Sequence, residues 1–182
     1  LEDDGITYRK FAPGYETYSK IGMYQRNIHN FDEEPILEGT LLPGQCMGCH
    51  TANATSPDQF LFHLRGKHGA TVVQRDGQRK WLETKTDKTI GRTAYSYWHP
   101  SGEYIAHSNN IIRQLFWTGN NERYIEVYDE ASDVVVHNVN TDEFLLNPLL
   151  RTEDFETYPV FSSDGKTLYF CSAPKVEVPA RA

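Results

Sequence analysis

The sequence predicts an all-β protein built from repeated sheets of a few strands each. Aromatic residues make up 13% of the 182 residues, and Gly and Pro number 13 and 9. Aromatic side chains favour half-buried strands, whereas Gly and Pro favour turns. No stretch of about a dozen residues keeps the 3.6-residue apolar period of an amphipathic helix. The third observation is an internal repeat.

The repeat joins two strand–turn–strand segments, AYSYWHPSGEYIAHS (94–108) and TYPVFSSDGKTLYFCS (157–172). They align when Gly102 is placed on Gly165, 63 residues further along the chain. Each segment has an aromatic strand, a Ser/Pro/Asp-Gly turn and a second strand of alternating character. If the turns are equivalent, both glycines should adopt positive φ, and Asp164 should bond to backbone amides of its own turn.

The repeat period exceeds the roughly 40–45 residues of a plain β-propeller blade. An insertion at 111–130, whose TGNN sequence predicts a loop, accounts for the excess. Residues 134–138 and 144–146 then predict two further strands joined by a turn. With the first strand pair they make four strands, which is the content of one blade. We therefore expect a complete blade over 93–150 and the start of another over 157–172.

The upstream half shows weaker versions of the same form. Residues 21–37 and 69–84 each predict strand–turn–strand, and Asp76-Gly77 is a strong hairpin turn signal. Residues 56–68 offer a short helix, because their SPD start contains capping residues. This half should hold two partial or irregular units. The chain as a whole predicts an incomplete β-propeller with about three blades' worth of strands, and an all-β sandwich is the alternative.

Charge and motifs exclude several functions. The net charge is −7, from 25 acidic and 18 basic residues, and the basic residues are scattered, so nucleic acid is not an expected partner. No apolar run approaches the roughly 18 residues of a membrane-spanning helix. The sequence lacks G-x-S-x-G, H-E-x-x-H and a phosphate-binding Gly loop. No catalytic residue is therefore predicted.

One motif carries chemistry: Cys46-Met47-Gly48-Cys49-His50 has the form Cys-x-x-Cys-His. Covalent attachment of a c-type haem needs two thiols that can add to two vinyl groups on one porphyrin edge. Two intervening residues give the right span, and the adjacent His50 can then reach the iron from one face. The sequence predicts a covalent haem c held by Cys46, Cys49 and His50.

Other uses of these cysteines stay open. His63, and after it His68, are the candidates for a second axial ligand of the iron. Together with Cys46 and Cys49, however, the same histidines match the spacing of a zinc site, CxxC-x13-H-x4-H. A disulfide within the motif is the other alternative. The third cysteine, Cys171, lies in strand-like LYFCSA and is expected to be a small buried hydrophobe.

Several runs resemble a known family. SSDGKTLYFCSA and HPSGEYIAHS resemble the Ser-Pro-Asp-Gly-Lys blade motif of TolB-like six-bladed β-propellers, although each lacks one element of that turn. Residues 6–173 more closely resemble periplasmic TolB-like propeller proteins that carry a Cys-x-x-Cys-His insertion, sometimes labelled cytochrome c biosynthesis proteins. The matching runs include YQRNIHNFDE, LLPGQCMGCH, FHLRGKHGATV, WHPSGEYIAHS and TYPVFSSDGKTLYFCSA.

This resemblance implies a TolB-like or WD-repeat-like propeller domain over 1–182, with the motif in a loop insertion at about 41–68. It also implies a periplasmic or cell-envelope location, and a role in electron transfer or redox sensing with envelope proteins or redox partners. Members of the group are longer, so we expect this chain to be part of a longer protein. The alternative function is a haem-free scaffold that binds envelope proteins, with CxxCH as a disulfide or zinc clip.

Overall fold

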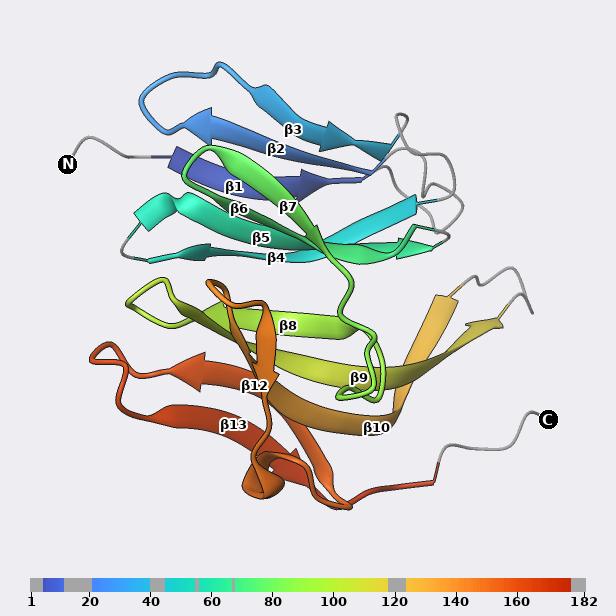
Figure 1. The fold of residues 1–182 in the computed structure, drawn as a ribbon. Coiled ribbons are helices and arrows are strands. Elements are labelled where there is room, and N and C mark those ends of the chain that lie inside the picture. Colours follow the sequence, from blue (N-terminus) through green and yellow to red (C-terminus); the bar gives the residue numbers. More distant parts are fainter. Residues whose placement is uncertain are drawn as a thin grey trace. The chain divides into compact units, whose positions relative to one another are not determined.

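A computed structural model describes residues 5–11, 21–39, 45–54, 56–66, 68–117 and 124–177. This part of the chain is dominated by antiparallel strands and contains the short 3-10 helix η3 (Pro148–Leu150). No helix in the described residues is long and apolar enough to cross a membrane. The chain divides into two compact units, Leu1–Glu83 and Thr84–Ala182 (Figure 1).

The first unit contains two antiparallel meanders in which each strand pairs with the next one along the chain (Figure 1). The turn that joins the strands Ala70–Arg75 and Gln78–Leu82 has positive φ at Asp76 (52°) and Gly77 (71°). A tight two-residue hairpin requires such angles, so the predicted turn is confirmed. The three-stranded sheet comprises β1 (Gly5–Lys10), β2 (Gly22–Asn27) and β3 (Glu34–Glu38), and the four-stranded sheet β4 (Gln45–Asn53), β5 (Ser56–Gly66), β6 (Ala70–Arg75) and β7 (Gln78–Leu82).

Strand β5 is the centre of this unit because it is buried on both faces. Alternate residues of a strand point to opposite faces. Phe60, Phe62 and Leu64 lie in the unit's apolar core, while Leu61 and His63 between them are buried as well. The core also contains residues of the other strands and of the segment before β2: Ile21, Met23, Ile36, Met47 and Val72.

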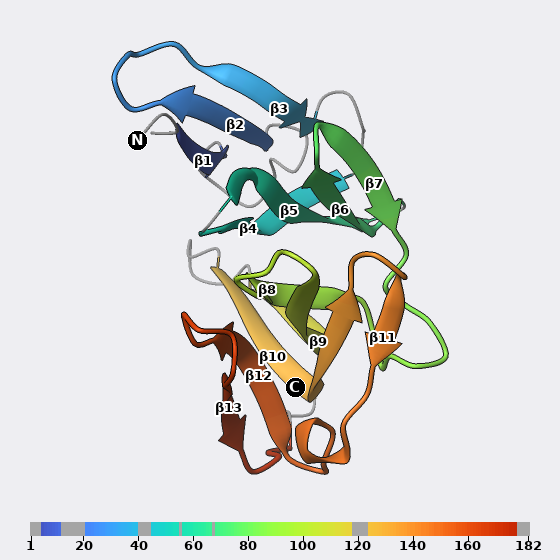
Figure 2. The ribbon, with the colours of Figure 1, turned by 60° about the vertical axis from the view of Figure 1, so that its left-hand side comes forward.

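The second unit contains one four-stranded and one two-stranded sheet (Figure 2). The larger sheet is the complete blade expected over 93–150, and the smaller one is the expected start of the next. The four-stranded sheet comprises β8 (Thr93–Trp98), β9 (Tyr104–Trp117), β10 (Tyr124–Asn138) and β11 (Glu143–Leu145). The two-stranded sheet comprises β12 (Phe155–Phe161) and β13 (Leu168–Ala173).

The internal repeat is confirmed in strand register. Trp98 pairs with Ile105 in β8–β9, and Phe161 pairs with Leu168, both 63 residues later, in β12–β13. Three further pairs correspond in the same way, at 93/109, 94/108 and 97/106 in the first hairpin, and the irregularities of the two hairpins overlap at Tyr95 and Tyr158. That irregularity gives positive φ to the equivalent residues Tyr95 and Tyr158, whose rings lie 4.6 Å apart between centroids.

The two turns also match bond for bond. Gly102 and Gly165 have φ of 72° and 71°, and the amide of each donates to the carbonyl oxygen three residues earlier. The Asp164 carboxylate accepts from the Lys166 amide at 3.1 Å and from the Ser162 hydroxyl at 2.6 Å. These bonds lower the pKa of Asp164, the Ser162 hydroxyl most of all. The predicted side-chain–backbone turn is therefore present.

Two expectations about the motif region are wrong. Residues 45–53 and 56–66 of the expected loop insertion form the strand pair β4–β5, and the helix proposed within 56–68 is part of β5. The apolar run FLFHL can be buried on both faces of a sheet, and this outweighs the capping residues before it. The upstream half consequently holds one full four-stranded sheet. The rest of the insertion, 41–44, 55 and 67, lies outside the described residues.

The second expected insertion, 111–130, extends the blade's central strands. Residues 111–117 and 124–130 continue β9 and β10 as an antiparallel pair, with a register irregularity at Asp129/Ala131. The predicted TGNN loop (118–121) lies outside the described residues. The extra length of the repeat is therefore carried by a long hairpin.

Gly165 and Gly77 allow the turn and its packing to be tested separately. Both have φ of 71°, but a Cβ at Gly165 would overlap the His99 ring, whereas a Cβ at Gly77 would meet nothing within 4 Å. We expect Gly77→Ala to lower the free energy of unfolding by about 1 kcal/mol from backbone strain alone. Gly165→Ala should cost about 3 kcal/mol, because steric overlap is added to the strain.

Urea unfolding of both variants, followed by circular dichroism, measures these two costs. Equal costs would show that the ring of His99 moves aside without penalty and that the turn is not held against it.

Candidate functional site

The Cys-x-x-Cys-His motif lies on β4, the first strand of the four-stranded sheet of the first unit. Gly48 pairs with His63 of β5, and pairing resumes at Thr51 with Leu61. Cys49 and His50 therefore stand opposite the single residue between these partners. Cys49 has φ of 49°, so the backbone turns at the second cysteine of the motif.

The two thiols are free and half-buried. Cys46 packs against the apolar core of the first unit. Burial raises the pKa of the Cys46 thiol, and the guanidinium groups of Arg9 and Arg65 oppose that rise. Cys49 makes a further, smaller contribution to the increase in the pKa of Cys46.

His50 and the backbone between the cysteines are both tied to β1. His50 is exposed, and its Nε2 lies 3.0 Å from the carbonyl oxygen of Thr7. Because a carbonyl oxygen only accepts, this contact assigns the proton to Nε2. Arg9 donates from Nη1 to the Met47 carbonyl at 3.2 Å. A Cβ on Gly48 would stand 2.7 Å from the same nitrogen, so the motif's small residue leaves space for Arg9.

His63 lies on the neighbouring strand but points into a closed environment. Its exposure is 2%, and its Nδ1 lies 2.8 Å from the Thr71 hydroxyl. Burial, aided by the charge of Arg65, lowers the pKa of His63 to about 3, so the ring is neutral near pH 7. His68 is exposed in the turn after β5. Cys46, Cys49 and His50 thus lie on one strand, and His63 is buried on the neighbouring strand opposite Gly48.

The donor set fits a covalent haem in part. Two free, half-buried thiols three positions apart on one strand, followed by an exposed imidazole, are the residue types that attachment at two vinyl groups and ligation of the iron require. His63 does not fit as a second axial ligand, because the core encloses its ring. For zinc, the described residues contain no group of three or more His, Cys, Asp or Glu side chains placed to hold a metal ion. The zinc alternative receives no support from them.

Sequence reasoning missed the contribution of β1. Thr7 and Arg9 precede their partners in the motif by 43 and 38 residues, and no local pattern connects them. The glycine inside the motif was the available signal, because Gly often marks a close approach of another group.

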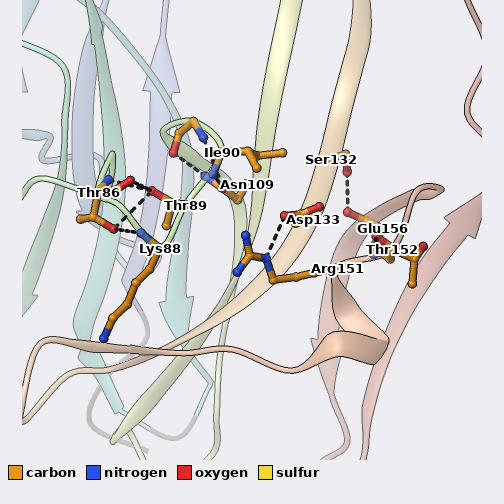
Figure 3. A network of polar contacts seen from close by, with 11 residues as sticks. Thr86, Lys88, Thr89, Ile90, Asn109, Ser132, Asp133, Arg151, Thr152 and Glu156 are labelled. Carbon is orange, nitrogen blue, oxygen red and sulfur yellow. Dashed lines mark hydrogen bonds and ion pairs between the residues drawn. The ribbon is translucent and has the colours of Figure 1, made fainter.

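A buried polar network in the second unit was also missed (Figure 3). The Asn109 side-chain oxygen accepts from the amides of Ile90 at 2.6 Å and Gly91 at 3.3 Å. Asp133, which is nearly buried, accepts from Arg151 Nε at 3.0 Å. These bonds attach the segments before β8 and after η3 to the blade. They satisfy buried polar groups, so we assign them a structural role.

The expectation for Cys171 is wrong. Its side chain is exposed on β13. A cysteine in an apolar strand is buried only where a neighbouring element covers it, and in the described residues β13 has one strand neighbour, β12.

The buried His63 predicts a pH dependence of stability. Unfolding returns its pKa from about 3 to the ordinary value of about 6.5, so the unfolded chain binds a proton that the folded chain does not. The free energy of unfolding should fall as the pH is lowered through this window, by about 1.5 kcal/mol from His63 between about pH 6.5 and pH 5. His63→Gln should remove this part of the slope, measured by urea unfolding at a series of pH values.

Val73→Ala serves as the control because it removes buried apolar atoms from the same sheet and leaves the imidazole in place. It should lower stability and keep the wild-type slope. A wild-type slope in His63→Gln would contradict the assignment.

Comparisons with known proteins identify the fold. No protein-family model and no curated protein sequence matches this chain. A structure from a structural and mechanistic study of two prolyl endopeptidases aligns with a TM-score of 0.57 and 15% identity, covering 94% of this chain and 25% of that one. The crystal structure of the tricorn protease aligns with a TM-score of 0.57 and 11% identity, covering 93% of this chain and 14% of that one.

The chain therefore spans a quarter or less of each of these structures. At this low sequence identity the likeness shows the fold alone. Both are β-propeller proteins. Together with the repeated meanders, this confirms the predicted fold class: the chain is an all-β, incomplete β-propeller whose sheets are not closed.

Proposed function

We propose that this chain is a β-propeller module that carries a covalent c-type haem at Cys46, Cys49 and His50 and serves in electron transfer or redox sensing. The observation that supports this function best is the arrangement on β4. Two free, half-buried thiols lie there on one strand, and an exposed imidazole follows them directly.

The attachment chemistry needs no oxidant. Each cysteine S–H adds across one vinyl C=C bond: a C–S bond forms, the proton goes to the other vinyl carbon, and nothing leaves. When bound, the haem supplies a one-electron iron couple. His50 would bind the iron through Nε2, which must first give up its proton and its contact with Thr7. The tautomer with the proton on Nδ1 is therefore the one required for ligation.

Of the three candidate histidines, His50 is the one placed to hold the iron under this proposal. His63 would have to leave the core and its bond to Thr71 to reach a group bound outside it. His68 belongs to a separate turn. His50 is therefore the one residue of this chain that we propose would hold the iron.

We further propose a periplasmic or cell-envelope location, with envelope proteins or redox partners as its contacts. The resemblance to periplasmic TolB-like proteins with a Cys-x-x-Cys-His insertion supports this location. Persistent disulfides form in that compartment, so the two thiols would be at risk of oxidation unless haem or another group took them.

A haem-free interaction scaffold is the second candidate, and one observation favours it. The long β9–β10 hairpin exposes the large apolar side chains Phe116 and Val127, at 50% and 55% of their surface, and because Val127 pairs with Gln114 the two lie on the same face. Exposed apolar groups gathered on one element favour protein contacts. The absorbance of the matured protein distinguishes the two candidates.

Expression in a host with haem-attachment machinery tests the first. The wild type should show a Soret band that survives acid–acetone extraction, and its mass should include one haem. Cys46→Ser and Cys49→Ser should each leave at most one thioether. The double variant can form none, so extraction should remove its haem. His50→Ala should retain covalent haem but change its spectrum, because the iron loses an axial ligand.

Cys171→Ser is the matched control, since it removes the third cysteine, which lies on β13 of the second unit. It should attach haem like the wild type. A colourless wild-type protein from such a host would overturn the haem proposal and leave the scaffold.

A further inference from the structure

Two Asp-Gly pairs of this chain form turns between paired strands: Asp76-Gly77 joins β6 to β7, and Asp164-Gly165 lies between β12 and β13. Glycine has no side chain to shield its backbone nitrogen. In an Asp-Gly pair that nitrogen can therefore attack the side-chain carboxyl carbon of the aspartate. The attack requires both groups to move, so its rate depends on how firmly the structure holds each turn. Both glycines have φ of 71°, and the two turns differ in what surrounds them.

The Asp164-Gly165 turn is held from several sides. The Asp164 carboxylate accepts from the Ser162 hydroxyl at 2.6 Å and from the Lys166 amide at 3.1 Å, and these bonds lower its pKa. The Gly165 amide, which contains the attacking nitrogen, donates to the Ser162 carbonyl at 2.9 Å. His99 donates from Nε2 to the Gly165 carbonyl at 3.0 Å. Both reacting groups are therefore fixed, and the neutral carboxyl that can lose water is scarcer.

The Asp76-Gly77 turn is far less restrained. The Asp76 side chain is 82% exposed; Arg75 Nε lies 3.4 Å from its Oδ2, and an ion pair this exposed contributes little. Strand pairing ends at Arg75 and Gln78, and among the described residues no backbone hydrogen bond outside the strands uses the Gly77 amide. A Cβ on Gly77 would meet nothing within 4 Å, so the tip of this hairpin can move without breaking a packing contact.

We propose that Asp76 is a site of spontaneous isoaspartate formation in the folded protein, and that the Asp164-Gly165 turn is protected from the same reaction. In the first step a bond forms between the Gly77 nitrogen and the side-chain carboxyl carbon of Asp76. The carboxyl hydroxyl leaves as water together with the amide proton, and a succinimide ring remains. Water then opens the ring at either carbonyl, which gives isoaspartate or restores aspartate. The reaction requires no oxidant and no second protein, and it is independent of haem binding.

The product would alter the hairpin. In isoaspartate the main chain runs through the side-chain carboxyl carbon, so the turn gains one backbone atom and the former α-carboxyl becomes a free carboxylate. The net charge stays the same. A two-residue hairpin depends on defined φ values at both positions, so the longer backbone would weaken the pairing of Arg75 with Gln78. The modified turn would accumulate with the age of the protein and stay confined to the tip of one sheet.

Incubation of the whole chain in heavy-oxygen water measures the reaction at each site. Ring opening takes one oxygen atom from water, so mass spectrometry detects both products. Digestion after lysine places Asp76 in peptide 68–80, and trypsin places Asp164 in peptide 152–166. Asp4-Gly5, whose aspartate lies outside the described residues, falls in peptide 1–10. Endoproteinase Asp-N cuts before aspartate but not before isoaspartate, which distinguishes the two products.

In the folded protein at about pH 6 and about 37 °C, we expect Asp76 to incorporate heavy oxygen at least about tenfold faster than Asp164. In about 8 M urea the restraints are lost, and the two rates should agree within about twofold. Gly77→Ala should slow the reaction at Asp76 at least about fivefold, because the methyl group shields the nitrogen.

Ser162→Ala is the matched variant at the protected turn. It removes the hydroxyl that holds the Asp164 carboxylate, so it should raise the rate at Asp164 and leave the rate at Asp76 unchanged. Equal rates at the two sites in the folded protein would overturn the proposal. So would the absence of incorporation at Asp76 over a period in which the unfolded chain reacts there. An unchanged rate at Asp164 in Ser162→Ala would overturn the protective role of that hydroxyl.

Discussion

Backbone pairing between strands that follow one another in the chain is the constraint on which this structure depends. The tight turns fix that pairing, and a slip of one residue would exchange the two faces of a strand. In the complete blade, the turn at Gly102 sets Trp98 opposite Ile105, and both side chains are buried. The equivalent turn at Gly165 sets the same register, so one local geometry, used twice, determines which side chains enter the interior.

The candidate haem motif shows how a strand can accommodate a chemical site. Pairing with β5 holds the backbone up to Gly48 and again from Thr51, while the irregularity at Cys49 and His50 frees these two residues from regular alternation. The ties from Thr7 and Arg9 then hold the freed segment from β1. A regular strand would fix its side chains rigidly in alternating directions, and a loop would fix them poorly. The bulged strand combines support with local freedom.

Sequence alone predicted the features that depend on a few neighbouring residues. The turns at Asp76-Gly77, Gly102 and Gly165 follow from the φ values that glycine tolerates, and the repeat follows from two such turns with similar strands around them. The four strands of the complete blade were predicted for the same reason. Their bounds shifted where β9 and β10 extend into the long hairpin, and β11 lies one residue earlier than expected.

Features that depend on distant packing were not predictable in the same way. The motif was expected in a loop because the proteins that this chain resembles carry it as an insertion, yet Met47 is buried in the core and pairs with Leu64. The buried state of His63 depends on strands on both sides of β5. Conversely, Cys171 was expected to be buried because its own strand is apolar. It is exposed, and in the described residues β13 has a strand neighbour, β12, on one side.

The order of the strands has a consequence for how the chain folds. Each sheet draws its strands from one continuous stretch of sequence, so forming it closes only short loops, at a small entropic cost. Low sequence separation between paired strands favours fast folding relative to β-proteins with distant pairings. During synthesis from the N-terminus, each meander could assemble once its own stretch has emerged, without waiting for later strands. The edge of the most recently made sheet would then be exposed at every stage. Charged residues on the edge strands β1 and β7 and a proline on the edge strand β3 discourage pairing with other strands, so they protect the growing chain as well as the finished one.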